Sequence, residues 1–201
     1  MAKDKFPSVT LTEILKWKRP HNTSENLLFC KKYLEPVMGQ PDQHGNYTCI
    51  IHHSDGKHPN IAFTAHHDTV HKEGGTQHIL IEDGTITSAG HDCLGADCGT
   101  GVWLILGMIE ANIPGVYLIF AGEEVGCIGS SAMALEKPSW ISKVDAMISF
   151  DRKGYDSVIT KQLGGRTCSD DFANSLANIL FDASVGEIVL APDPTGAYTD
   201  C

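Results

Sequence analysis

The 201-residue sequence lacks the features of a membrane, secreted or nucleic-acid-binding protein. No apolar run reaches about 18 residues, which excludes a membrane-spanning helix. The Met-Ala-Lys-Asp-Lys start has no apolar signal core, so we expect a cytoplasmic protein. Basic side chains are few: 15 Lys and Arg face 25 Asp and Glu, and the net charge of −10 argues against a nucleic-acid partner.

Regularly spaced cysteines and C-terminal histidines are also missing. Without a secretory signal, the irregularly spaced cysteines are expected to be free thiols in a reducing compartment: Cys30, Cys49, Cys93, Cys98, Cys127, Cys168 and Cys201. All ten histidines lie between His21 and His91. The composition, with 42% hydrophobic residues, is otherwise that of a globular protein with one self-sufficient core.

Apolar spacing predicts a helical start followed by alternating strands and helices. Capping patterns at Thr10 with Glu13 and at Asn22 with Glu25 predict two short helices. Strands are expected at 47–53, 61–69, 78–81, 85–88, 115–120, 144–150, 157–161 and 187–190, and helices at 101–111, 131–136 and 171–183. This alternation is typical of an α/β fold whose mostly parallel mixed sheet is sandwiched between helices. No repeat or linker interrupts it, so we expect a single domain.

Acidic residues and a histidine follow the predicted strands at their carboxyl ends, where open α/β sheets bind ligands. They are His66 to Asp68 after the second strand, Glu123 and Glu124 after the fifth, Asp151 after the sixth, and Asp97 ahead of the buried helix. Carboxylates that converge in a cleft raise each other's pKa unless a cation neutralises them. Imidazole with carboxylates is the ligand set of zinc or a neighbouring transition metal, so the sequence predicts a metal site.

The spacing within these motifs suggests separate roles. His66 and Asp68 are two residues apart on an extended segment and therefore share a face, whereas His67 points the other way. Asp68 can then hydrogen-bond the distal nitrogen of His66 and fix its tautomer. The adjacent side chains of Glu123 and Glu124 are expected to diverge, so that one binds metal while its neighbour acts as a general base.

Four motifs, Ala-His-His-Asp-Thr-Val, Leu-Gly-Ala-Asp, Gly-Glu-Glu-Val-Gly and Phe-Asp, resemble those of the co-catalytic di-zinc peptidases in order as well as spacing. This superfamily comprises zinc aminopeptidases, carboxypeptidases and related deacylases with an α/β sheet between helices. The resemblance implies a first zinc ion bound by His66, Asp97 and Asp151. A second ion would share Asp97 and also bind Glu124. Glu123 would be the general base for a metal-bound water, with Asp68 supporting His66.

The chain departs from the family's pattern at two positions. The family completes its second metal site with a histidine near the C-terminal end, and this sequence has none after His91. Three explanations stay open: residues 1–201 form one catalytic domain that lacks its C-terminal end, the second ion is held incompletely, or only one ion binds. Cys98 stands where relatives usually carry Asp or Asn, and a thiol so close to a metal can bind it or be oxidised.

We therefore expect a zinc exopeptidase, and an aminopeptidase in preference to a carboxypeptidase. His66 and Asp97 are 97 − 66 = 31 positions apart, too few for the lid domain that some relatives insert there. Nothing after Asp151 resembles an inserted dimerisation domain, and the oligomeric state is left open. One alternative is a deacylase or dipeptidase that acts on small N-acyl amino acids instead of peptides. Another is a metal-binding protein that has lost catalysis with its second site.

The remaining residues have plainer interpretations. The other histidines are expected to be surface or structural: His21, His44, His52, His53, His58, His67, His71, His78 and His91. His71 and His91 flank the motifs and are candidates for substrate contact. A separate zinc site of His91, Cys93 and Cys98 is disfavoured because its spacing fits no standard pattern. The stripe on the last helix is expected to be core: Phe172, Leu176, Ile179 and Leu180.

Overall fold

The computed structural model describes residues 7–192 except 91, 153, 155, 164, 184 and 185. It divides into two compact units, one ending at Asp151 and one beginning at Arg152, and the expectation of one domain stays a prediction. Within the described residues, no helix combines the length and the apolar character needed to cross a bilayer. The described cysteines are free thiols, as expected, and Cys201 lies outside the described residues.

The first unit contains most of the regular structure. Its strands are β1 (Trp17–Lys18), β2 (Tyr47–Ile51), β3 (Ile61–His66), β4 (Gly75–Thr76), β5 (Ile79–Glu82), β6 (Thr85–Ser88), β7 (Gly115–Phe120) and β8 (Ala146–Ser149). Its α-helices are α1 (Leu11–Leu15), α2 (Ser24–Phe29), α3 (Glu35–Met38), α4 (Ala96–Glu110) and α5 (Ile128–Glu136). A π-helical turn (Cys30–Leu34) joins α2 to α3, and a 3-10 turn (Ile141–Lys143) precedes β8.

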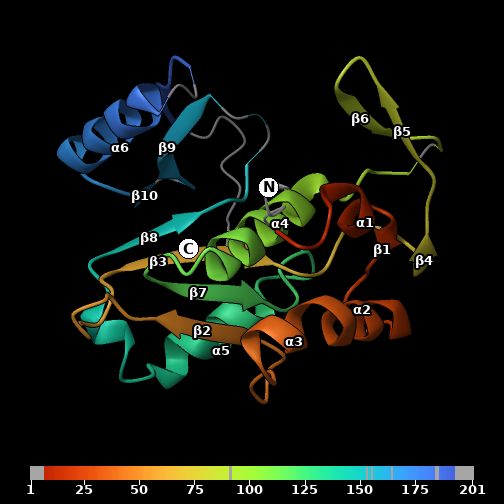
Figure 1. Ribbon diagram of the computed structural model, residues 1–201, viewed down its shortest axis with the longest axis horizontal. Helices are drawn as coiled ribbons and strands as arrows, with labels where there is room; N and C mark the ends of the chain where they lie inside the picture. Colours follow the sequence, from red (N-terminus) through yellow and green to blue (C-terminus); the bar gives the residue numbers. More distant parts are fainter. Residues whose placement is uncertain are drawn as a thin grey trace, which may run out of the picture. The chain divides into compact units, whose positions relative to one another are not determined.

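A four-stranded sheet with the order β2-β7-β3-β8 lies at the centre of this unit (Figure 1). β3 pairs in parallel with both β7 and β8, while β2 is an antiparallel edge strand. Helices α4 and α5 lie on opposite sides of the sheet. The mixed, mostly parallel sheet between helices confirms the predicted fold class.

Strand β7 contributes to a hydrophobic core on each face of the sheet, because its residues alternate between the two faces. Val116 and Leu118 pack with Met133 of α5. Tyr117 and Ile119 belong to the core on the other face, to which α4 and α1 contribute. Every residue of β7 is buried, as the unbroken apolar run of 115–120 predicts for a central strand.

The element boundaries depart from the predictions where polar side chains decide them. Thr10 and Glu13 form the predicted capping box of α1. The cap of α2 is Thr23, whose side chain accepts from the Asn26 N–H, and the prediction of Asn22 is wrong by one residue. Asn22 instead takes a left-handed conformation, with φ of 59°, which the short asparagine side chain tolerates.

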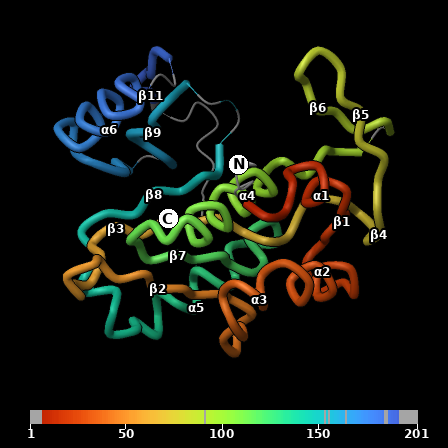
Figure 2. The backbone as a smooth tube through the Cα atoms, viewed as in Figure 1, coloured from red at the N-terminus to blue at the C-terminus, as the bar shows by residue number. Residues whose placement is uncertain are grey.

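Figure 2 shows the path between β3 and α4, which passes through β4 and the β5–β6 hairpin and then returns to the sheet. Asp83 and Gly84 both have positive φ, as a two-residue hairpin turn requires. The hairpin is a two-stranded sheet of its own, and β4 pairs only with β1 among the described strands. The described residues between His66 and Asp97 form no large inserted domain.

The second unit is a three-stranded sheet with one helix. It comprises β9 (Ser157–Gln162), β10 (Gly165–Arg166), α6 (Asp170–Asp182) and β11 (Val189–Pro192), with the sheet order β10-β9-β11. Ser169 caps α6 by accepting from the Phe172 N–H. The prediction that the apolar stripe is core is wrong at Ile179, which is 65% exposed, and Phe172, Leu176 and Leu180 are only half-buried. The three short strands of this unit cover only part of the helix surface.

Candidate metal centre

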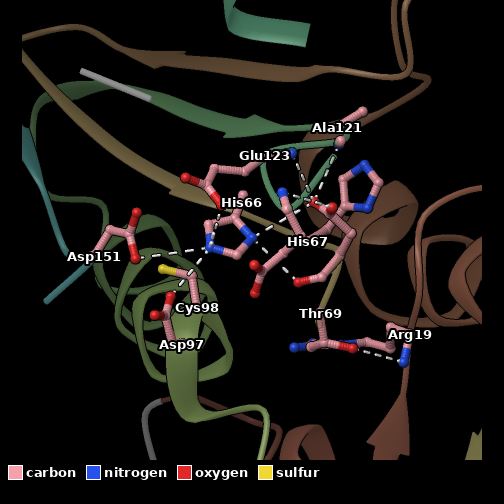
Figure 3. A network of polar contacts seen from close by, with 12 residues as sticks. Arg19, His66, His67, Thr69, Asp97, Cys98, Ala121, Glu123 and Asp151 are labelled. Atoms are coloured by element: carbon pink, nitrogen blue, oxygen red, sulfur yellow. Dashed lines mark hydrogen bonds and ion pairs between the residues drawn. The ribbon is translucent and has the colours of Figure 1, made fainter. Parts of the chain in front are cut away.

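The predicted ligands come together at the carboxyl end of the central sheet, all within the first unit (Figure 3). His66 is the last residue of β3, the two glutamates Glu123 and Glu124 follow β7, and Asp151 follows β8. Asp97 lies in the first turn of α4. Because β3, β7 and β8 run in parallel, their carboxyl ends deliver these side chains to one edge.

The imidazole of His66 is at the centre of the cluster and is only 1% exposed. Its Nε2 lies 3.2 Å from Asp97 Oδ1, 3.7 Å from Asp151 Oδ1 and 3.8 Å from Glu123 Oε2. Its Nδ1 lies 3.1 Å from the backbone oxygen of Asp68 and 3.5 Å from the Asp68 carboxylate. Asp68 thus contacts the distal nitrogen as predicted, but its backbone carbonyl is the nearer acceptor.

The Asp68 carboxylate is fully buried and makes contacts that the sequence did not predict. It accepts backbone N–H hydrogen bonds from Gly122 at 3.1 Å, Glu123 at 3.2 Å and Glu124 at 3.2 Å. Burial alone would raise the pKa of Asp68, but the hydrogen bond and charge of His66 outweigh it and the pKa is lowered. One carboxylate therefore connects the histidine of β3 to the turn that carries both glutamates.

The two glutamates converge on His66 more closely than the prediction of diverging neighbours implies. Ligand atoms of His66, Glu123 and Glu124 lie within 4.8 Å of one another. Both carboxylates reach the imidazole because the residues after β7 form a turn, as expected for the end of this strand. The Gly126 N–H donates to the Glu123 carbonyl at 2.9 Å, and Gly122 has a positive φ of 70°.

The cluster has more negative charge than its own residues can neutralise. Burial raises the pKa of Asp151 and of Glu124, whereas the hydrogen bond to His66 lowers the pKa of Asp97. Burial opposes the charge on His66, but hydrogen bonds to Asp151, Asp68 and Asp97 raise its pKa well above the ordinary value. Carboxylates held this close to one another favour a bound cation. Within the chain itself, protonated His66 supplies the positive charge that neutralises part of theirs.

The donor atoms fit a metal ion of the zinc type. Besides the group of His66 with the two glutamates, ligand atoms of His66, Cys98 and Asp151 lie within 4.8 Å of one another. Nitrogen, oxygen and sulfur donors are the ligands of zinc and its neighbours. Among the described residues, His66 is the one imidazole in these groups, and it belongs to both.

The histidines expected to be structural include two that are buried beside the centre. The Asn26 side-chain amide donates to His67 Nδ1 at 3.0 Å, and His67 Nε2 donates to the Gly45 carbonyl at 3.3 Å. His71 lies 2.9 Å from Thr69 Oγ1 and 2.9 Å from the Cys93 carbonyl, which leaves neither ring nitrogen for substrate. His91 lies outside the described residues, and Cys93 joins no ligand group within them.

We expect His67 to destabilise the fold in acid. Burial lowers its pKa to about 4, against roughly 6.5 in the unfolded chain, so protonation between these values favours unfolding. Its contribution to stability is full above pH 6.5 and falls by about 2 kcal/mol between pH 7 and pH 5. Urea unfolding at both pH values, in metal-free buffer, measures this loss. His67→Gln should lack that part of the pH dependence, and identical slopes in the two proteins would contradict the prediction.

Arg19 is a buried cation next to the centre that the sequence did not single out. Its side chain is fully buried, with the guanidinium 4.3 Å from the centre of the Phe29 ring. Among the described residues its Nε and Nη1 have no hydrogen-bond partner, while Nη2 lies 3.5 Å from the Gly95 carbonyl. Burial lowers the pKa of Arg19 to about 10, so it stays charged at neutral pH. The Lys-Arg-Pro segment gave no indication of this burial.

Comparison with solved structures shows the same fold in several proteins, among them a tripeptidase and an aminopeptidase. A tripeptidase from Staphylococcus aureus subsp. aureus Mu50 is 23% identical, with a TM-score of 0.60 over 75% of this chain and 44% of that chain. The aminopeptidase LapA of Legionella pneumophila is 17% identical, with a TM-score of 0.58 over 94% and 54%. PhTET1-12s is 13% identical, with a TM-score of 0.64 over 94% and 84%. No curated protein sequence gave a match.

The chain spans less than half the length of the tripeptidase, and at these identities the structural likeness establishes the fold alone. The family relationship comes from the sequence model of peptidase family M28, which matches residues 46–180. That range contains every residue of the centre, from His66 to Asp151. The match covers more than half of the chain and agrees with the resemblance to co-catalytic zinc peptidases, so the chain belongs to peptidase family M28.

Proposed function

We propose that the protein is a zinc-dependent aminopeptidase that releases residues from the N-terminus of peptides. The observation that carries this proposal is the convergence of His66 with four carboxylates at one edge of the sheet. Membership of peptidase family M28 supports it. The short connection between His66 and Asp97, which holds only β4 and one hairpin, favours an aminopeptidase over relatives with an inserted lid domain.

The chain's residues divide the work of hydrolysis. His66, Asp97 and Asp151 would hold one ion, and Asp97 and Glu124 would hold a second. A bound zinc ion supplies an acidified water and a Lewis acid for the substrate carbonyl. Glu123, whose side chain is 14% exposed, accepts the proton of the attacking water and returns it to the leaving amine.

A second candidate function is metal binding without catalysis. The observation that favours it is that His66 is the one imidazole in the ligand groups of the described residues. A second ion would then have an oxygen-rich ligand set without the histidine of the family's pattern, whereas the first ion would have His66. This candidate predicts about one metal ion per chain and no hydrolysis.

Removal of metal tests the proposal. Treatment with a chelator is expected to abolish hydrolysis of an aminoacyl reporter, and added zinc is expected to restore it because the reaction needs the ion. The control is His66→Ala, which zinc should not restore. A parallel panel of N-acyl amino acids identifies a deacylase, and hydrolysis of that panel alone would contradict an aminopeptidase. Zinc binding without hydrolysis of either panel would favour the second candidate.

A further inference from the structure

We propose that the sulfur of Cys98 is a ligand of the metal ion that His66 and Asp151 hold. The inference rests on the proposed function in one respect, since it requires a metal at this centre. The sulfur lies close to two predicted ligands. Ligand atoms of His66, Cys98 and Asp151 all lie within 4.8 Å of one another, and Figure 3 shows the sulfur beside the His66 ring on the side of Asp151.

The irregular start of α4 brings two consecutive side chains to the centre. Asp97 has φ of −88° and ψ of 110°, and Cys98 has φ of −104° and ψ of 39°, neither of which is helical. In a regular helix, neighbouring side chains point about 100° apart and would not meet at one ion. Here Asp97 Oδ1 lies 3.2 Å from His66 Nε2, and the Cys98 sulfur lies within 4.8 Å of a ring nitrogen of the same histidine.

The surroundings of the sulfur leave it room, and its partners among the described residues are backbone groups. A Cβ at Gly101 would lie 2.4 Å from the Cys98 sulfur, so the glycine at that position opens space for the thiol. The thiol donates a weak hydrogen bond to the Phe150 carbonyl at 3.3 Å. Phe150 directly precedes Asp151, so this bond holds the sulfur next to a predicted ligand.

The chemistry favours coordination over an inert buried thiol. Cys98 is fully buried, so its sulfur is shielded from solvent beside two predicted ligands. A metal ion deprotonates a coordinating thiol: the S–H bond breaks, the sulfur–metal bond forms and the proton goes to solvent. A thiolate would shift the preference of the site from manganese or magnesium toward zinc, cobalt and cadmium.

Cobalt(II) loading of the full chain tests the assignment spectroscopically. The wild-type protein should show a thiolate-to-cobalt charge-transfer band in the near ultraviolet, together with the visible bands of bound cobalt. Cys98→Ser should retain the visible bands and lose the charge-transfer band. Cys49→Ser is the matched control, because Cys49 is half-buried and belongs to no ligand group of the described residues. It should keep the wild-type spectrum.

X-ray absorption of the zinc-loaded wild type removes any dependence on how the variant folds. A sulfur scatterer at about 2.3 Å from zinc is expected, whereas nitrogen and oxygen alone at about 2.0–2.2 Å would overturn the inference. Bound cobalt with identical spectra in wild type and Cys98→Ser would also overturn it, and would leave the proposed function intact. If the wild type binds no metal, both the proposed function and this inference are wrong.

Discussion

Replacement of Glu123 by glutamine is expected to lower kcat for aminoacyl hydrolysis by roughly a thousandfold, the usual contribution of a general base. Glutamine has the same shape but cannot accept the proton of the attacking water. The backbone N–H of residue 123 still bonds to Asp68 in the variant, so the turn after β7 should keep its conformation. KM and bound metal should therefore change little. Steady-state kinetics and elemental analysis of the purified variant measure both quantities.

The neighbouring substitution Glu124→Gln is the matched control. It alters a carboxylate of the same turn and of the same ligand group, but one assigned to the metal. We expect it to release metal and to recover part of its activity at high zinc concentration. The opposite pattern, with metal lost from Glu123→Gln and retained in Glu124→Gln, would show that the two roles are exchanged. Full activity of Glu123→Gln would show that Glu123 is not the general base.

The centre was predictable because its parts are local in sequence and the fold brings them together. Polar ligands stand at or just after the ends of β3, β7 and β8, as Glu123 and Glu124 do within a few residues of Phe120. A parallel sheet then places the strand ends at one edge, so motif order alone indicates convergence. The same logic explains why β7, apolar throughout, was predicted with its observed bounds.

Contacts between distant segments were not predictable in this way. The three hydrogen bonds of Asp68 join residues 54 to 56 positions apart, and no local spacing encodes them. Arg19 is buried because α2 and the start of α4 close over it, whereas its sequence neighbours are Lys18 and Pro20. Strands as short as β1 and β4, with two residues each, have too few positions to show a period.

Asp68→Asn is expected to weaken both the fold and the metal centre. The Asp68 carboxylate is itself buried and only accepts hydrogen bonds, and three backbone N–H groups donate to its two oxygens. An asparagine amide replaces one of these oxygens with a donor, which leaves at least one N–H facing another donor in a buried position. The cost is about 1–3 kcal/mol of unfolding free energy, which urea denaturation measures. Metal affinity should fall about 10–100-fold, because His66 loses the charged carboxylate 3.5 Å from Nδ1 and keeps only the backbone carbonyl of residue 68 as its partner there.

Titration of Asp68→Asn with zinc separates a role of Asp68 in positioning His66 from a role in supporting the fold. Asp92→Asn is the control, since Asp92 is an exposed aspartate paired with Lys18, and its loss should cost little stability and no metal affinity. Acid should mimic Asp68→Asn in the wild type: the lowered pKa of Asp68 means that its contribution is present above the ordinary carboxyl pKa and is lost as pH falls through the folded value. A variant that is destabilised but binds zinc as tightly as wild type would show that Asp68 holds the turn without orienting His66. Loss of both unfolding free energy and zinc affinity would show that the Asp68 carboxylate holds the turn and also orients His66.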